Sequence, residues 1–425
     1  MEIIVLPIFL LLVLITVPIG MALLVAAIFG LSYFADMPLL MIGQAMFLKL
    51  DKFSLLSILF FVLAGNLMSS GSIARKIVEF AEALVGHFRS GLPISSIAAC
   101  GIFGAVSGSA LATLSAIGGL MVPAMQKKGI SKDLSVGVVT SASILGIIVP
   151  PSIPMIIYCL VTDTSIAKLF IAGFLPALLI GGALSIYSVF RSGREGAIEV
   201  SPFSFTELWT AFASGIWALL MPAIIFGGIF SGVFTATEAA VVATVYAYLV
   251  EIFVYRKMSL GQIVRITIDS GVMLGAILII TAGSMVLSDY LSLMQIPDRI
   301  TQWIVATMNS KWFFLLMVNA MLLVVGCFME VISAILIVTP ILFPVATEFG
   351  IDPIHFGILI CVNLGIGYVT PPVGVNCFLA ASLFKMPVST VFRVTAPTLV
   401  ALLISLGLIT AVPWLSTILP DLLVK

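Results

Sequence analysis

Prolines and glycines recur along this chain in matched pairs that all share one fixed spacing. The matched positions are Pro123 and Pro344, Gly129 and Gly350, Gly146 and Gly367, Pro150-Pro151 and Pro371-Pro372, and Pro176 and Pro397. Four of the six prolines between 92 and 190 have such a partner, although a background proline frequency of about 5% predicts almost none. The chain therefore contains two copies of one unit, each with helix-breaking residues inside apolar sequence.

The composition is that of an integral membrane protein. Hydrophobic residues make up 61% of the chain and charged residues 9%, whereas soluble domains carry about 25% charged residues. The apolar runs are long and continuous, which favours helices over a β-barrel. Equal numbers of basic and acidic residues, with no basic arm, argue against a nucleic-acid partner. No phosphate-binding loop motif is present, so the chain carries no ATP-hydrolysing motor of its own.

Membrane-spanning helices are predicted at 3–31, 53–70, 133–160, 166–190, 211–231, 236–256, 263–288, 352–385 and 390–418. The first is expected to be a single retained helix, because it is longer than a signal-peptide core. Amphipathic segments at 37–52, 75–88 and 296–309 are expected to lie along the membrane interface. The polar loop from Arg191 to Glu207, with the helix pair 211–256, is expected to separate the two copies. The five cysteines lie in apolar stretches without metal-ligand spacing, which favours small core residues.

Two further apolar runs, 92–126 and 312–347, are interrupted near their middles. Their arms of about 15 residues would be about 22 Å long as helices, too short for a hydrocarbon core of about 30 Å. We therefore predict two re-entrant hairpins that each enter and leave by one face. Their tips are expected at Ser107-Gly108-Ser109 and at 326–330.

Charge predicts that the two hairpins enter from opposite faces. The base of the first carries Arg89, Lys127, Lys128 and Lys132, which favours the cytoplasmic side. The base of the second is acidic, at Glu348 and Asp352. If the base of the first hairpin is cytoplasmic, then alternation of the spans places Arg191 and Arg194 on the cytoplasmic side and Asp163 on the outside. The predicted fold is therefore an all-α integral membrane protein with an inverted repeat, the architecture of alternating-access transporters.

Four breaks should converge near the membrane midplane: the two tips and the interrupted helices 146–152 and 365–372. Proline has no amide hydrogen to donate, so carbonyl groups before each Pro-Pro lose their helical partners. Such carbonyls suit a hard cation such as Na⁺, and the free N–H ends of half-helices suit a substrate carboxylate. Ser and Thr at these places also pack or bond the backbone in many membrane helices. The candidate substrate-binding residues are Ser107, Ser109, Thr113, Ser152, Glu330 and Asn376.

Two acidic residues in apolar sequence need separate interpretations. Glu330 lies at the second tip, where its counterpart in the first copy is Ser109. It could bind substrate hydroxyls or a basic group, bind a cation, take part in proton coupling, or serve a structural pairing. Glu238 follows Thr235 and Thr237, so we predict a structural role for it in the first turn of a capped helix.

Three segments resemble the large membrane subunit of tripartite ATP-independent periplasmic (TRAP) transporters. They are the tip sequence 104–113, the break Ile148-Val149-Pro150-Pro151-Ser152, and the stretch 234–240. The resemblance covers essentially the whole chain, with Ala236 standing where we expect proline. It implies a Na⁺-driven importer of organic acids in the bacterial inner membrane. It also implies two partners, a small four-helix membrane subunit and a periplasmic substrate-binding protein.

The resemblance further implies at least two sodium sites and a carboxylate site. One sodium site would lie between the first tip and 146–150, the other between the second tip and 365–370. The carboxylate would meet Ser107 and Ser152. The implied sodium-site residues are Ser107, Gly108, Ser109, Gly146, Val149, Pro150, Gly326, Glu330, Gly365, Gly367 and Thr370.

In proteins of this kind a transport domain moves as an elevator against a scaffold. The resemblance assigns 1–91 and 191–310 mainly to the scaffold, and 92–190 and 311–425 mainly to the transport domain, one repeat in each. The absence of arginine near the breaks favours sialic acid over a four-carbon dicarboxylate held by two salt bridges. A stand-alone sodium-coupled dicarboxylate or anion carrier shares the repeat and the breaks. A channel is a third possibility, and its flux would not depend on a sodium gradient.

Overall fold

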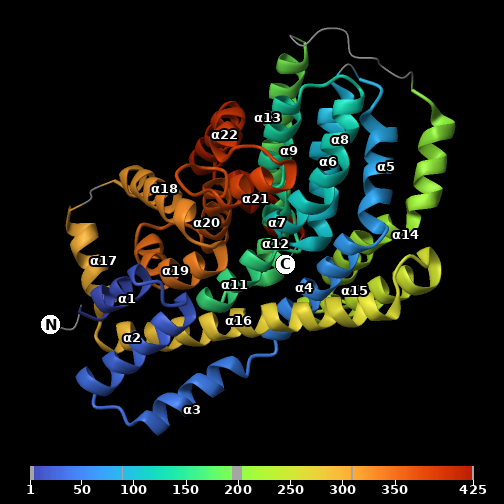
Figure 1. Cartoon of the computed structure of the whole chain (residues 1–425). Helices are drawn as coiled ribbons and strands as arrows, with labels where there is room; N and C mark the ends of the chain where they lie inside the picture. The colour runs from blue at the N-terminus through green and yellow to red at the C-terminus, as the bar shows by residue number, and fades with distance from the viewer. Residues whose placement is uncertain (1–3, 89, 194–202, 308–309, 424–425) are drawn as a thin grey trace.

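The computed structural model describes residues 4–88, 90–193, 203–307 and 310–423. Within those ranges the regular structure is helical and contains no β-strand, as Figure 1 shows. Arg89 and Arg194, which contributed to the predicted orientation, lie outside the described residues. Eight described helical stretches are long and apolar enough to cross a membrane, or nine if the bent pair formed by 39–50 and 55–70 counts as one span.

The elements of the first half are α1 (Val5–Leu14), α2 (Ile19–Phe34), α3 (Leu39–Leu50), α4 (Leu55–Ser70), α5 (Ile73–Val85), α6 (Gly91–Ser107), α7 (Ala110–Thr113), the π-helix η2 (Leu114–Gly118), α8 (Gly119–Lys127), α9 (Lys132–Ala142), α10 (Leu145–Ile148), α11 (Ile153–Thr162), α12 (Ile166–Ala172) and α13 (Phe174–Ser192). Those of the second half are α14 (Phe205–Phe230), α15 (Ala236–Leu249), the π-helix η3 (Val250–Tyr255), α16 (Leu260–Leu293), α17 (Ile296–Thr307), α18 (Lys311–Phe328), α19 (Val331–Glu348), α20 (Pro353–Gly367), α21 (Val375–Phe384), α22 (Val388–Ala411) and α23 (Trp414–Leu423).

Both predicted hairpins are present. In the first, α6 is joined through a two-residue tip to α7, η2 and α8; in the second, α18 is joined to α19 through Met329 and Glu330. The arms are longer than predicted, since α6 has 17 residues and α18 and α19 have 18 each. With 18 residues each, α18 and α19 are among the stretches long and apolar enough to cross a membrane, so the prediction that these two arms are too short to span is wrong. Helix α6, with 17 residues, is shorter and is not among those stretches.

The repeat extends beyond the hairpins and broken helices. When the residue numbers of α2 are shifted by the spacing of the paired prolines, they become 240–255, which is most of α15 together with η3. The same shift turns the residue numbers of α5 into 294–306, which is close to α17. The packing of α2 follows the same correspondence, since α2 packs against α16 as α15 packs against α4. The packing of α5 does not: α5 packs against α6, whereas α17 packs against α19, and the counterpart of α6 is α18. The expectation that 211–256 lies outside both copies is therefore wrong for α15.

The N-terminal prediction of one helix over 3–31 is wrong. The chain forms α1 and α2, which pack against each other, because Pro18 cannot donate an amide hydrogen within a continuing helix and instead stands at the N-cap of α2. Thr16 before it adopts a positive φ of 66°. The predicted span 390–418 is likewise two helices, α22 and α23, interrupted near Pro413.

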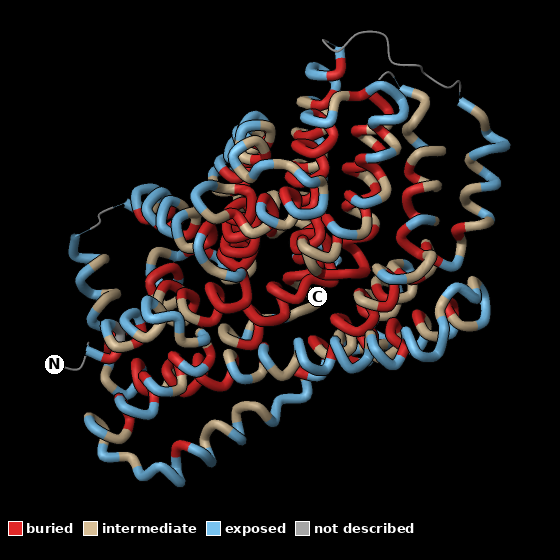
Figure 2. The backbone as a smooth tube through the Cα atoms, in the orientation of Figure 1, coloured by how far each residue is buried: buried red, intermediate tan, exposed pale blue. Residues whose placement is uncertain are grey.

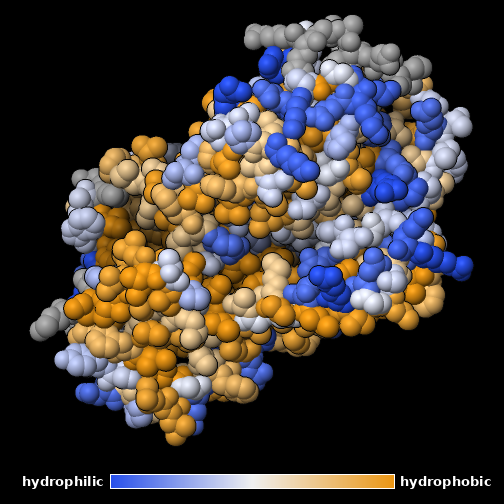
Figure 3. Space-filling view, viewed as in Figure 1, coloured by the Kyte–Doolittle hydropathy of each residue, from blue (hydrophilic) through white to orange (hydrophobic). Residues whose placement is uncertain are grey.

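The apolar side of the amphipathic segment 75–88 is covered by protein. Ile73, Ile77 and Ala81 of α5 are fully buried, and α5 packs between α6 and α14. Figure 2 shows buried residues concentrated where the broken helices meet at the centre of the molecule, with exposed residues on the outer helices. Many exposed side chains are large and apolar, among them Leu14, Leu40 and Phe190. Figure 3 shows a broad hydrophobic surface on the lower left, with hydrophilic residues gathered at the upper end over α8 and α13.

Candidate functional site

The first hairpin turns at Ser107, Gly108 and Ser109. Gly108 has a φ of +59°, a left-handed conformation in which glycine avoids strain. A Cβ on Gly108 would lie 2.8 Å from the carbonyl oxygen of Pro151. Ser109 then caps α7, because its hydroxyl accepts a hydrogen bond from the amide of Ala112. The tip is thereby held against the Pro-Pro break of the same copy.

Hydroxyl groups just inside this tip form a short chain. The Thr113 hydroxyl donates to the carbonyl oxygen of Ser109 at 2.8 Å, and the Ser107 and Thr113 hydroxyl oxygens are 3.1 Å apart. Since Thr113 uses its hydrogen toward Ser109, Ser107 donates to Thr113. Both side chains are buried. The tip therefore presents a cluster of oxygen atoms inside the protein.

The first broken helix brings its own backbone to this cluster. A Cβ on Gly146 would lie 2.6 Å from the Ser109 carbonyl oxygen and would overlap the Thr113 hydroxyl. Helix α10 ends at Ile148, Val149 is extended, and Ser152 caps α11 by accepting from the amide of Met155. The Ser152 hydroxyl also donates to the carbonyl of Ile147 at 2.6 Å across the break. Tip and break thus meet as predicted, through Gly146 against Ser109 and through Pro151 against Gly108. Val149 and Pro150 lie along the chain between these two contacts.

The second tip is built around Glu330. Its carboxylate caps α19 by accepting from the amides of Ile332 at 2.8 Å and Ser333 at 3.2 Å. Its other oxygen accepts from the Tyr368 hydroxyl at 3.1 Å, and that hydroxyl accepts from the amide of Val331 at 3.1 Å. Among the interpretations left open for Glu330, the structure supplies a structural one, a cap at the start of the second arm.

The second broken helix meets the second tip through backbone atoms. A Cβ on Gly367 would lie 2.6 Å from the Cα and 2.7 Å from the carbonyl oxygen of Gly326, and the Gly374 amide donates to the carbonyl of Cys327 at 3.2 Å. The Thr370 hydroxyl donates to the carbonyl of Ile366 at 2.8 Å. The Pro-Pro peptides of both breaks are cis.

The two broken helices also contact each other. A Cβ on Gly365 would lie 2.7 Å from the Ile147 side chain, and Asn376 donates from Nδ2 to the Ser143 hydroxyl at 2.8 Å. Asn376 is fully buried, and its Oδ1 has no hydrogen-bond partner. All four predicted breaks are therefore brought together, and Asn376 joins one copy to the other.

The two sites differ in exposure. Pro150, Pro151 and Ser152 are buried, whereas Pro371, Pro372 and Glu330 are exposed. Helix α4 covers the first tip closely, since a Cβ on Gly65 would lie 3.0 Å from the Cα and carbonyl oxygen of Ser107.

The oxygen atoms at the breaks suit a hard cation. Backbone carbonyl and hydroxyl oxygens are the groups that hold Na⁺ at unwound helices. Because Gly146 has no side chain, the space beside the Thr113 hydroxyl and the Ser109 carbonyl oxygen stays open, and a Cβ at this position would fill it. Within the described residues, no group of three His, Cys, Asp or Glu side chains could hold a metal ion, and the five cysteines are free and buried.

Three residues at the site were not predicted. Tyr368 lies between two predicted positions, Gly367 and Thr370, and a buried tyrosine hydroxyl usually has a partner, so the sequence held a signal for it. Ser143 and Gly65 contact the site through tertiary packing alone. The prediction for Glu238 is confirmed, because Thr235 and Glu238 form a capping box at the start of α15.

The comparisons with known proteins agree with this architecture. Residues 6–415 match the family described as tripartite ATP-independent periplasmic transporter, DctM component. The chain is 41% identical over 372 residues to the C4-dicarboxylate TRAP transporter large permease protein DctM of Pseudomonas aeruginosa, covering 87% of each protein. It is 34% identical over 405 residues to the sialic acid TRAP transporter large permease protein SiaM of Vibrio cholerae, covering 95% of each.

A solved structure supports the fold. The YdaH transporter of Alcanivorax borkumensis superposes with a TM-score of 0.62 at 12% identity, over 90% of this chain and 88% of that one. At that identity the likeness concerns the fold alone. The family is one of transporter permease subunits and not of enzymes, and the predicted resemblance is confirmed. This chain belongs to the DctM family of TRAP transporter large permeases, multi-pass proteins of the bacterial inner membrane.

Proposed function

We propose that this permease imports an organic acid, driven by a Na⁺ gradient. Two sodium sites lie at the two junctions of tip and break, and the segments 92–190 and 311–425 move as an elevator against the scaffold segments 1–91 and 191–310. The observation that carries the proposal is the convergence of four interrupted helices on one another, with Ser143 and Asn376 bonded between the two copies.

The substrate is a carboxylate held at half-helix ends. The capped starts of α7 and α11 direct backbone N–H groups toward the first tip and break, near Ser107 and Ser152. The sequence has no arginine near the breaks, which favours a monoacid with hydroxyl groups, such as sialic acid. A relative named for C4-dicarboxylates and one named for sialic acid both match the chain, so the test includes both substrates.

The partners are a small membrane subunit and a periplasmic substrate-binding protein. The family description names a tripartite system, and the isethionate TRAP permease DctMQ of Oleidesulfovibrio alaskensis matches this chain over 62% of its own length. That protein is therefore long enough to include a second component.

The proposal is tested by uptake of labelled acids into vesicles that contain the chain and its small subunit. Uptake should require an inward Na⁺ gradient and an added periplasmic binding protein. Uptake without any soluble protein would favour the stand-alone carrier, and flux independent of Na⁺ would favour a channel.

Substitutions at the first junction connect uptake to the site. Ser107→Ala and Ser152→Ala should raise the substrate concentration for half-maximal uptake while the melting temperature changes little. Ser405→Ala is a matched control, because this buried serine only donates to the carbonyl of Ala401 within its own helix. Wild-type uptake by both site variants would contradict the placement of the carboxylate.

A further inference from the structure

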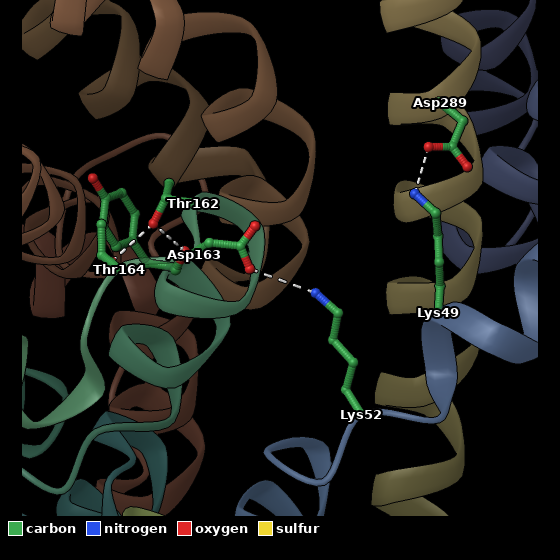
Figure 4. A network of polar contacts seen from close by, with 7 residues as sticks. Lys49, Lys52, Thr162, Asp163, Thr164 and Asp289 are labelled. Carbon is green, nitrogen blue, oxygen red and sulfur yellow. Dashed lines mark hydrogen bonds and ion pairs between the residues drawn. The ribbon is translucent and has the colours of Figure 1, made fainter.

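An ion pair connects the two parts of the molecule at one edge. Lys52 lies between α3 and α4 in the scaffold segment, and Asp163 lies between α11 and α12 in the transport segment. The Lys52 Nζ and an Asp163 carboxylate oxygen are 3.7 Å apart, as Figure 4 shows. Asp163 ends α11 with a positive φ of 51°. The hydroxyl oxygens of Thr162 and Thr164 on either side are 2.9 Å apart, which fixes the turn that presents the carboxylate.

A second polar contact crosses the same boundary. The Ser284 hydroxyl of α16 donates to the carbonyl oxygen of Leu336 in α19, the second arm of hairpin 2. That carbonyl has no amide donor in its own helix, because the residue four positions later is Pro340. The scaffold thus completes a hydrogen bond that the hairpin cannot make for itself.

Both contacts border one small cavity of about 200 Å³. Its lining includes Lys52, Asp163, Ser284, Ser288 and Pro340. A second ion pair, Lys49 with Asp289, lies at the same edge but joins α3 to α16, two helices of the scaffold, and Figure 4 shows the two pairs together. The charge pattern of the sequence predicts that this edge faces the periplasm.

We propose that the Lys52–Asp163 ion pair and the Ser284–Leu336 hydrogen bond form a latch between scaffold and transport segments. The latch holds the arrangement seen here and opens each time the transport segments move. This inference rests on the proposed elevator motion. A contact between two bodies that slide past each other cannot persist in both end states, whereas the Lys49–Asp289 pair, inside one body, persists in both. An exposed ion pair is a weak contact, so its loss should change the ratio of the two states about two- to five-fold.

Distance measurements between the two segments test the latch without any substrate. Spin labels at Gln44 in α3 and Leu178 in α13, both exposed positions, report scaffold against transport segment. The native cysteines are buried and leave little background labelling. A pair at Gln44 and Leu293, both in the scaffold, is the fixed reference. The chain is measured in lipid vesicles together with its proposed small membrane subunit.

Lys52→Ala should increase the population of a second Gln44–Leu178 distance about two- to five-fold over wild type. Ser284→Ala, which removes a hydrogen bond, should increase it about two- to ten-fold. The exchange Lys52→Asp with Asp163→Lys should return the distribution toward wild type. Lys49→Ala should leave it unchanged, because it breaks a pair within one segment. Distributions that are the same in wild type, Lys52→Ala and Ser284→Ala overturn the latch, and so does an equal change in Lys49→Ala. Failure of the proposed function would instead appear as uptake that does not depend on Na⁺.

Discussion

Ser109 and Glu330 occupy equivalent places in the two copies and perform the same structural task. Each caps the second arm of its hairpin, Ser109 through the amide of Ala112 and Glu330 through those of Ile332 and Ser333. Only Glu330 has a second partner, the Tyr368 hydroxyl. The two tips are therefore alike in backbone design and unlike in charge.

This relationship predicts a graded series at the second tip. Glu330→Ala should destabilise the protein by about 1 kcal/mol or more, because α19 loses its cap. Glu330→Ser should lose less, since serine caps the equivalent helix in the first copy. Thermal unfolding in detergent measures both, with Tyr368→Phe reporting the tyrosine bond separately. Equal melting temperatures for the alanine and serine variants would show that the cap does not stabilise the tip.

The approach of Gly146 to the first tip predicts a sharp steric effect. Gly146→Ala would place a Cβ 2.6 Å from the Ser109 carbonyl oxygen, and overpacking of this kind costs about 1–3 kcal/mol. We also expect loss of Na⁺-dependent protection against unfolding, because the tip must withdraw from the break.

Gly119→Ala is the matched control, in the second arm of the same hairpin. A Cβ there meets nothing within 4 Å, and alanine stabilises a helix by roughly 0.5–1 kcal/mol over glycine. The two alanine variants should therefore shift the melting temperature in opposite directions. A Gly146→Ala protein as stable as Gly119→Ala would contradict the packing of the break on the tip.

Glu251 makes a buried contact that couples α5 to η3. Its Oε1 accepts from the amides of Ser72 at 2.9 Å and Ile73 at 3.2 Å at the start of α5, and a Cβ on Gly71 would overlap that oxygen. Gly71→Ala and Glu251→Ala should each destabilise the chain, the first by a clash and the second by loss of the cap.

The double variant at these two positions should be more stable than the sum of the single effects predicts, because removing the carboxylate also removes the clash. The four proteins are compared by denaturant or thermal unfolding. Strict additivity would show that Gly71 and Glu251 do not meet.

The bond between Asn376 and Ser143 predicts coupling between the two copies. Ser143→Ala leaves the buried amide of Asn376 without an acceptor, at a cost of about 1–3 kcal/mol. Asn376→Ala in the same chain should lower that cost, because the unpaired donor is then gone. Melting temperatures of the two single variants and the double variant check this, and a Ser143→Ala protein of wild-type stability would refute it.

The sequence predicted the breaks well because prolines and glycines act locally. Pro150-Pro151 and Pro371-Pro372 interrupt helices wherever they stand, and their duplication marked them as one architectural feature. Pro18 also interrupts a helix, but it lies in one long apolar run, and the prediction there was a single helix instead of α1 and α2. The fold class and both hairpin tips followed from such local rules.

Contacts between residues far apart in the chain could not be predicted from a single sequence. Gly71 and Glu251 stand in different halves of the chain, and nothing in either neighbourhood indicates that one makes room for the other. Asn376 was expected at the site as a substrate ligand, and the structure shows its amide bonded to Ser143 of the other copy. Its role toward substrate stays a prediction, as do the roles of the other candidate ligands.

One duplicated element is folded differently in the two copies. Residues 39–70 form α3 and α4, which meet at an angle of 56°, whereas the corresponding residues 260–291 lie within the single helix α16. The elbow between α3 and α4 carries Lys52, and the straight counterpart has no loop at that place. A perfectly symmetric carrier would hold its two end states at equal free energy. In the proposed elevator, this difference between the two copies would make the free energies of the two end states unequal before any ion or substrate binds.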